Sequence, residues 1–220
     1  MARETINAKR TRGVEIIKRL DAAMPEAKIE LDFTTPLELV VAVALSAQTT
    51  DKRVNMVTPE LFARFKTAAD YAAVTPADIE PFIKTVGLFR NKAKNLVKLG
   101  QALVEKHHGQ VPGSRAELSE LPGVGNKTAG VVSIHLGTDV GFPVDTHILR
   151  LSKRMGFTNE TEPDDVEAEL RKIFPQDMWF KGHQLIIWHG RRCCFALSPE
   201  CHRCVVADLC PKKGVKPKKD

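Results

Sequence analysis

The chain has 220 residues, of which 43% are hydrophobic and 27% are charged, enough for one large domain or two modest ones. Its longest apolar run, residues 39–45, is too short to cross a bilayer, so no membrane role is indicated. The formal charge of +6 and the isoelectric point near 9.1 suggest an acidic partner, most simply nucleic acid. Such a modest charge is also common in proteins that bind no nucleic acid, so it decides little alone.

The opening segment, MARETINAKRTRGVEII, is basic and amphipathic and lacks the apolar stretch of an export signal. We therefore expect a cytoplasmic protein whose cysteines stay reduced. At the other end, the tail PKKGVKPKKD is expected to be a solvated basic segment.

Between these ends nearly all periodicity is helical, and strand-type alternation is nearly absent. Capping patterns predict helix starts at Thr35, Thr75 and Ser114, each followed three residues later by a carboxylate. About ten short helices are expected. Six glycines are predicted to end helices in a left-handed conformation, namely Gly87, Gly100, Gly109, Gly137, Gly156 and Gly190.

Residues 121–129, LPGVGNKTA, predict a tight turn between a helix over 114–120 and another that begins near Asn126. Gly123 and Gly125 let the backbone turn without a Cβ in the way, so amide N–H groups at the helix start could approach a phosphate closely. Such contacts would recognise the nucleic-acid backbone and not the bases. An ordinary corner between two helices is the alternative.

Lys127 lies in the first turn of the helix after this hairpin, where the helix dipole disfavours an ammonium and so favours a nucleophilic amine. A phosphate-contacting or solvated lysine is the simpler interpretation. Eighteen positions later, Asp145 precedes the periodic run ILRLSKRMG and is a candidate N-cap. An ionised carboxylate there could also stabilise positive charge on a sugar ring. The helix over 126–136 and its return loop could bring this pair together.

Four cysteines near the C-terminus, Cys194, Cys201, Cys204 and Cys210, have the spacing C-x6-C-x2-C-x5-C. Four thiolates can bind an iron–sulfur cluster or a structural zinc. The spacing favours the cluster, because a zinc site more often has two C-x2-C pairs. Zinc comes second and disulfides last. Cys193 is left over, and a small buried hydrophobe is its expected role.

Taken in order, LPGVGNKTAG, VDTHILRL and the cysteine spacing resemble the endonuclease III family. This family is part of the helix-hairpin-helix DNA glycosylase superfamily that carries an iron–sulfur cluster, and the likeness runs from about Thr11 to Cys210. It implies an all-α protein of two helical lobes with a DNA-binding cleft between them. Residues 30–140 would form a helical barrel with the helix-hairpin-helix at 114–136. Residues 1–29 and 141–220 would form the domain of a four-iron four-sulfur cluster held by the four cysteines.

The resemblance further implies a bifunctional glycosylase and abasic-site lyase that removes oxidised pyrimidines from duplex DNA. Lys127 matches the nucleophile that attacks C1′ and forms a Schiff base, and Asp145 matches the assisting carboxylate. Gln48 matches the amide that bonds the orphaned base, and Leu88 the wedge that fills the vacated stack. For both, ordinary loop packing is the alternative. A monomer in the cytoplasm or nucleoid is expected.

Two positions depart from the family pattern. Asn126 stands where relatives often have arginine, which should weaken phosphate attraction slightly. The Phe89-Arg90 pair stands where close relatives have a tyrosine-containing loop, which leaves the lesion and opposite-base preferences of this chain open. Rival hypotheses are an adenine glycosylase, against which Lys127 argues, a mismatch-directed thymine glycosylase, and a DNA-binding module with a redox cluster. Basic residues near the cysteines, Arg191, Arg192, His202 and Arg203, are candidates to meet phosphates.

Overall fold

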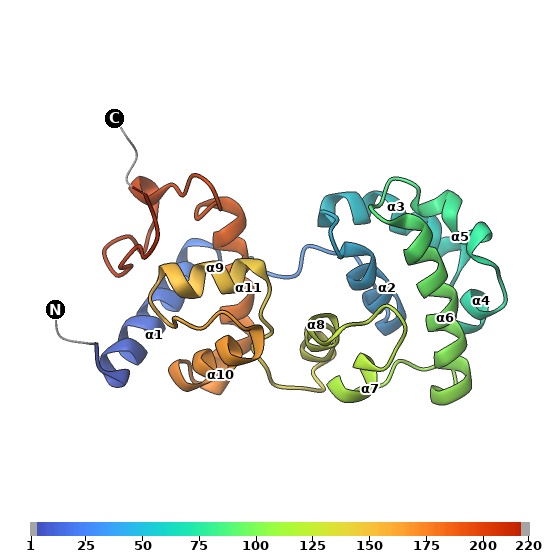
Figure 1. Ribbon diagram of the computed structural model, residues 1–220, viewed down its shortest axis with the longest axis horizontal. Coiled ribbons are helices and arrows are strands. Elements are labelled where there is room, and N and C mark those ends of the chain that lie inside the picture. Colours follow the sequence, from blue (N-terminus) through green and yellow to red (C-terminus); the bar gives the residue numbers. More distant parts are fainter. Residues whose placement is uncertain (1–3, 217–220) are drawn as a thin grey trace. The chain divides into compact units, whose positions relative to one another are not determined.

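The computed structural model describes residues 4–216, and within them every regular element is a helix (Figure 1). The last four residues of the predicted basic tail lie outside this range. No described helix is long and apolar enough to span a membrane. In chain order the helices are α1 (Ile6–Ala23), α2 (Pro36–Ser46), α3 (Asp51–Arg64), α4 (Ala68–Ala72), α5 (Pro76–Ile83), α6 (Phe89–His107), α7 (Arg115–Ser119), α8 (Asn126–Leu136), α9 (Thr146–Arg154), α10 (Pro163–Ile173), η1 (Gln176–Met178), α11 (Trp179–Arg192) and η2 (Cys201–Arg203).

The three predicted helix starts are confirmed. The hydroxyl of Thr35 accepts the N–H of Glu38, and the hydroxyl of Ser114 accepts that of Glu117. At α5, the Asp78 carboxylate accepts the backbone N–H of Thr75 at 2.8 Å. Each side chain satisfies donors that the first turn of a helix leaves without partners.

Three of the six glycines predicted to end helices have the expected left-handed conformation. Gly109, Gly137 and Gly156 have positive φ, whereas Gly87, Gly100 and Gly190 do not. Gly100 lies inside α6, where a Cβ would come within 2.6 Å of the Tyr71 Cβ, and Gly190 lies inside α11. These two glycines therefore allow close helix packing, a requirement that the local sequence does not reveal.

The chain forms two compact units. The central unit runs from Glu30 to Asp139 and contains α2 to α8. In it, α6 packs against α4 and α5, and α2 packs against α3 and α8. Its core is closed by buried aliphatic and aromatic side chains, including Leu39, Val41, Leu45, Leu61, Tyr71, Ile79, Ile83, Leu99 and Val132.

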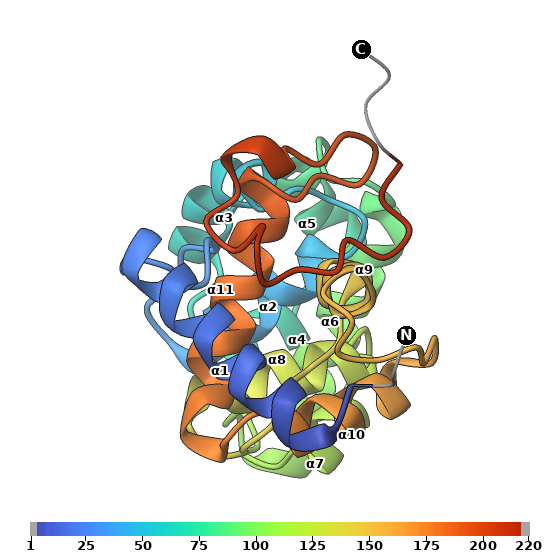
Figure 2. The same ribbon diagram turned by 90° about the vertical axis from the view of Figure 1, so that its left-hand side faces the viewer.

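The terminal unit joins the segment up to Ile29 with the segment from Val140 onward. Helix α1 lies along α11 and α10, and α9 packs against α10 and α11 (Figures 1 and 2). Its core is rich in aromatic rings, with Phe174 in ring contact with both Phe142 and Phe157. The chain's two ends therefore share one hydrophobic core.

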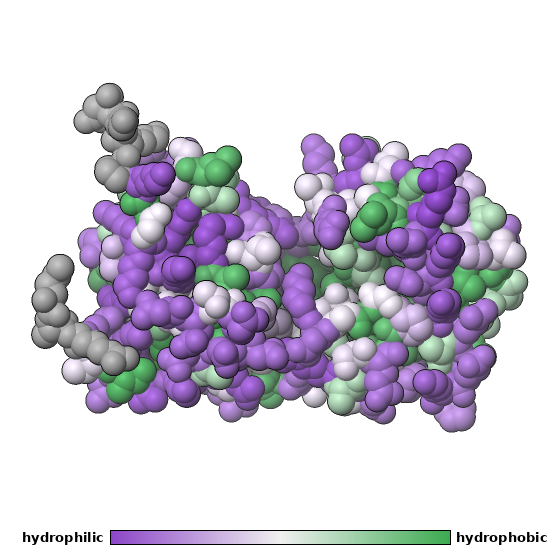
Figure 3. All heavy atoms as spheres, in the orientation of Figure 1, coloured by the Kyte–Doolittle hydropathy of each residue, from purple (hydrophilic) through white to green (hydrophobic). Residues whose placement is uncertain are grey.

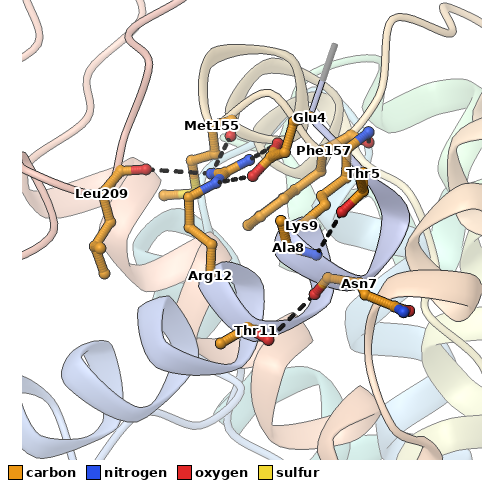
Figure 4. A network of polar contacts seen from close by, with 10 residues as sticks. All are labelled: Glu4, Thr5, Asn7, Ala8, Lys9, Thr11, Arg12, Met155, Phe157 and Leu209. Atoms are coloured by element: carbon orange, nitrogen blue, oxygen red, sulfur yellow. Dashed lines mark hydrogen bonds and ion pairs between the residues drawn. The ribbon is translucent and has the colours of Figure 1, made fainter. Parts of the chain in front are cut away.

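Polar contacts reinforce this joining of distant segments (Figure 4). The Arg12 guanidinium, on α1, donates to the Glu4 carboxylate and to the carbonyls of Met155 and Leu209. The Lys9 ammonium donates to the Phe157 carbonyl at 3.0 Å. Helix α1 is thus tied to the segment just after α9 and to Leu209, the residue before the last of the four cysteines.

The visible surface of each unit is mainly hydrophilic, with hydrophobic side chains scattered over it (Figure 3). Among the described residues, the most exposed large hydrophobic ones are Leu197, Met56 and Leu88, at 100%, 62% and 59%. Exposed apolar side chains on a protein that is otherwise polar outside are candidates for contact with a ligand.

Candidate functional site

The segment between α7 and α8 forms the predicted hairpin. Leu121 and Val124 are buried, and the Val124 N–H donates to the Leu121 carbonyl at 3.0 Å, which closes the turn. Gly123 has φ +81°, and a Cβ there would lie 2.9 Å from the Cβ of Asn95 on α6. Both the backbone conformation and the close neighbour therefore require glycine at position 123.

Gly125 is glycine for a different reason. Its φ of −81° suits any residue, and a Cβ there would have no atom within 4 Å. It is the N-cap residue of α8, and no side chain caps that helix. Without a side chain at 125, an anion can approach the first amide groups of α8, where the helix dipole is positive.

Lys127 lies exposed in this first turn of α8. Within the described residues 4–216, no hydrogen bond or ion pair holds its ammonium. The neighbouring Asn126 accepts a hydrogen bond at 3.0 Å from the Arg115 guanidinium of α7. Sequence reasoning missed Arg115, which brings a positive charge beside Asn126 at the hairpin. Only the folded turn makes residues 115 and 126 neighbours.

Asp145 is the N-cap of α9, and its carboxylate accepts the N–H of Ile148 at 2.8 Å. The N-cap interpretation is therefore confirmed, and the side chain stays partly exposed. Asp145 belongs to the terminal unit and Lys127 to the central unit. That the two side chains act on one nucleotide stays a prediction.

Gln48 and Leu88 are both exposed residues of loops in the central unit. Gln48 lies between α2 and α3, and Leu88 directly precedes α6. Their φ angles are +54° and +58°, a left-handed conformation that non-glycine residues rarely adopt. The Arg90 guanidinium lies 4.8 Å from the centre of the Phe89 ring, and a surface hollow is lined by residues 88–91. The Leu88 side chain is therefore exposed to solvent at the edge of this hollow.

The four predicted ligand cysteines line one pocket of the terminal unit, together with Cys193. Met155, Val206 and Val215 supply apolar walls. None of the five cysteines forms a disulfide in this structure. Burial raises the pKa of Cys204 and Cys210, a cost that bound iron would offset, because iron deprotonates its thiol ligands. Four soft sulfur donors around an apolar pocket fit an iron–sulfur cluster.

Arg154, on α9, organises the loop that follows Cys194. Its guanidinium donates to the carbonyls of Phe195 and Ala196 at 2.7 and 2.6 Å and lies 3.3 Å from the Cys194 sulfur. The Arg154 carbonyl lies 3.5 Å from the Cys210 sulfur. A fixed cation here offsets negative charge on the thiolates. By contrast, the exposed Arg203 bonds Glu200 and the Arg192 carbonyl within the protein.

Cys193 and His189 lie against Cys204. The imidazole Nε2 of His189 is 3.5 Å from the Cys204 sulfur, and the ligand atoms of all three residues lie within 4.8 Å of one another. Burial raises the pKa of the Cys193 thiol to about 12 and lowers that of His189 to about 4. Both groups are therefore neutral neighbours that can hydrogen-bond the sulfur. Sequence reasoning missed His189, because nothing in its spacing within α11 marks it.

Two family models match the chain. Residues 41–176 match the HhH-GPD superfamily base excision DNA repair protein. Residues 194–210 match the iron-sulfur binding domain of endonuclease III, and this match begins and ends at two of the four predicted ligands.

Curated relatives and solved structures agree with these matches. Endonuclease III of Synechocystis sp. is 45% identical over 93% of this chain and 94% of its own, and that of Escherichia coli K12 is 41% identical over 93% and 97%. A solved trapped endonuclease III–DNA covalent intermediate, 41% identical, superposes with a TM-score of 0.88 over 92% of this chain and 96% of its own. A thermostable thymine-DNA glycosylase shares the fold at 20% identity, with a TM-score of 0.79. The chain therefore belongs to the endonuclease III family of iron–sulfur DNA glycosylases in the HhH-GPD base excision repair superfamily.

Proposed function

We propose that this DNA glycosylase and abasic-site lyase removes oxidised pyrimidines, such as thymine glycol, from duplex DNA and cleaves the resulting abasic site. The observation that carries the proposal is the position of Lys127. Its amine is exposed in the first turn of an uncapped helix, directly after a glycine hairpin suited to a phosphate. A nucleophile and a backbone-binding element thus lie within one helical turn.

In the proposed reaction, the damaged nucleotide leaves the base stack, because its glycosidic bond is inaccessible within the duplex. The neutral Lys127 amine attacks C1′, and the electron pair of the glycosidic bond leaves with the base, which takes up a proton. The attached nitrogen loses a proton, and its lone pair then forms the C1′=N bond as the C1′–O4′ bond breaks and O4′ takes up a proton. The product is a protonated Schiff base between Lys127 and the ring-opened sugar. The imine acidifies the proton at C2′, and its removal expels the 3′ phosphate by β-elimination. Water then hydrolyses the imine, which frees the Lys127 amine and releases the enzyme.

We assign supporting roles to three further residues. Asp145, whose carboxylate is fixed by a helix-start amide, would stabilise positive charge on the sugar or accept the lysine proton. Gln48 would bond the base left unpaired, and Leu88 would fill the vacated space in the stack. Gly123 and Gly125 would bring the α8 amides to the DNA backbone. The central and terminal units would be the two domains that bind the duplex.

For the metal centre we propose a four-iron four-sulfur cluster ligated by Cys194, Cys201, Cys204 and Cys210. The fourth ligand is assigned to Cys194 and not Cys193, because the iron–sulfur family match begins at Cys194 and the Arg154 guanidinium lies 3.3 Å from its sulfur. The Cys193 thiol instead faces the Glu200 carbonyl. When bound, the cluster would supply structural cross-linking of the loops. We further propose that the protein acts as a monomer in the cytoplasm or at the nucleoid.

Borohydride trapping on a duplex with one thymine glycol tests the lysine assignment. Cluster-loaded wild-type protein should form a covalent adduct, and mass spectrometry of its peptides should place the DNA on Lys127. Lys127→Ala should lose the adduct and slow strand cleavage by roughly a thousandfold or more, since the nucleophile is gone. Lys98→Ala, an exposed lysine on α6, is the matched control and should react like the wild type.

The same assay separates the rival functions. Duplex binding without any adduct, on either thymine glycol or a preformed abasic site, would point to a monofunctional glycosylase or a pure binder. Adduct formation on a thymine mismatch but not on thymine glycol would indicate a mismatch-directed thymine glycosylase instead.

A further inference from the structure

Two of the four non-glycine residues with positive φ among the described residues are Gln48 and Leu88. A left-handed backbone at an ordinary residue persists only where the surroundings impose it. Both side chains are exposed, so their own packing does not impose it. Another group must hold these two loops.

The two loops lie against each other although forty residues separate them in the chain. A Cβ built on Gly87, next to Leu88, would lie 3.4 Å from the Gln48 carbonyl oxygen and 3.6 Å from the Thr49 hydroxyl. A shift of either loop would therefore disturb the packing of the other.

Lys92 connects these loops. It lies on α6, one helical turn after Leu88, and its backbone N–H donates to the Leu88 carbonyl at 3.1 Å. Its ammonium donates to the carbonyls of Leu45 and Ala47 at 2.8 and 2.6 Å and to the Thr49 hydroxyl at 3.1 Å. The side chain is 8% exposed. Its three acceptors match the three donors of an ammonium.

The acceptors also explain why a buried cation is tolerated there. Leu45 and Ala47 lie at the C-terminal end of α2, where the last carbonyls lack helical partners and the helix dipole is negative. Burial lowers the pKa of Lys92, and the three acceptors favour the charged form. A buried lysine on one helix thus caps another helix, and the capped end leads directly into Gln48.

We propose that Lys92 is a positioning residue that couples the Gln48 and Leu88 loops, so that both side chains enter a duplex together at one base pair. The inference rests on the DNA-probing roles proposed above for those two residues. Lys92 itself touches no DNA. It acts by fixing the distance between the group that bonds the orphaned base and the wedge that replaces the extruded one, and small misplacements of such groups slow reactions strongly.

The test compares wild type, Lys92→Met, Leu88→Ala and the double variant, all with cluster loaded. One readout is single-turnover excision of thymine glycol. The other is the fluorescence of 2-aminopurine placed opposite a tetrahydrofuran abasic analogue, which reports loop insertion without any chemistry. Lys92→Met should slow excision about tenfold and reduce the fluorescence change. In the Leu88→Ala background, Lys92→Met should slow excision by less than about twofold, because Lys92 acts through the Leu88 loop.

Two further variants separate positioning from general loss of structure. Lys98→Met removes an exposed lysine from the same helix and should match the wild type in both readouts. Thr49→Val removes one acceptor at the partly exposed end of the contact and keeps the side-chain shape. It should reduce the fluorescence change with a thermal unfolding midpoint close to wild type, even if Lys92→Met proves too unstable to assay.

The outcomes are distinguishable. Excision and fluorescence unchanged in folded Lys92→Met, or effects of Lys92→Met and Leu88→Ala that simply add, would overturn the coupling. If Thr49→Val stands in for an unstable Lys92→Met, an unchanged fluorescence response overturns it equally. Absence of any wild-type adduct at Lys127 would instead remove the proposed function, while the fluorescence readout would still report on the loops.

Discussion

The hairpin of residues 121–125 and the cysteine segment of residues 193–210 are both short, but they are stabilised differently. The hairpin is held by its own backbone hydrogen bond, two buried apolar anchors and a glycine packed on Asn95. The cysteine segment contains only one short 3-10 helix, and its carbonyls are bonded by arginines from α9. The hairpin thus depends on local conformation and one contact with α6, whereas the cysteine segment adds hydrogen bonds from distant arginines to its own backbone turns.

The largest expected effect is loss of a cluster ligand. Cys194→Ser should abolish the visible absorption of the cluster and leave substoichiometric iron, because a hydroxyl is a poor substitute for a soft thiolate. The paired variant Cys193→Ser should keep the iron and sulfide content of the wild type, since Cys193 is a buried thiol outside the proposed ligand set. Iron and sulfide analysis of the two proteins decides the matter, and the reverse result would make Cys193 the ligand.

The second-largest effect is expected for Arg154→Met. It removes charge-assisted hydrogen bonds to Phe195 and Ala196, each of which contributes about 1.5–3 kcal/mol. Iron release to a chelator should therefore be faster by about tenfold or more. Arg171→Met removes another terminal-unit arginine, one placed over the Trp179 ring, and controls for the loss of a cation. Equal release rates in both variants would mean that Arg154 does not organise the cysteine segment.

Gly123→Ala and Gly125→Ala should separate the two roles within the hairpin. Gly123→Ala should lower the free energy of unfolding by about 1–2 kcal/mol or more, because its φ is +81° and Asn95 is too close. Gly125→Ala should leave thermal unfolding nearly unchanged and weaken duplex binding, since it blocks the approach to α8. Calorimetry and a binding titration test the pair. Equal losses of stability would show that both glycines serve the fold alone.

The smallest effect concerns the tie between α1 and the cysteine segment (Figure 4). The hydrogen bond from Arg12 lowers the pKa of Glu4 in the folded protein. A lowered carboxyl pKa adds stability above the unfolded value, which is lost as pH falls through the folded pKa. Glu4→Gln should therefore lower the unfolding midpoint slightly at neutral pH and have no effect in acid. The pair is partly exposed, so less than about 1 kcal/mol is expected.

Much of the central site was accessible from the sequence. The helix starts at Thr35, Thr75 and Ser114, the hairpin glycine at 123 and the N-cap at Asp145 all follow from groups within a few residues of one another. Local hydrogen bonding and backbone preference act over that range, so their patterns are visible in the chain itself. The cysteine spacing is likewise local, and it predicted the thiols that line one pocket.

Only the tertiary structure decided the rest. Gly100 and Gly190 were mistaken for helix ends because the helix that crosses each of them is distant in sequence. Lys92, Arg115 and Arg154 look like ordinary surface cations until folding brings acceptors to them. The physical reason is that a bridging cation is defined by its acceptors. Acceptors that lie 11, 41 or 47 residues away are not visible in the sequence around the cation. The sequence therefore determined which chemical groups the protein carries, and the fold determined what holds them in place.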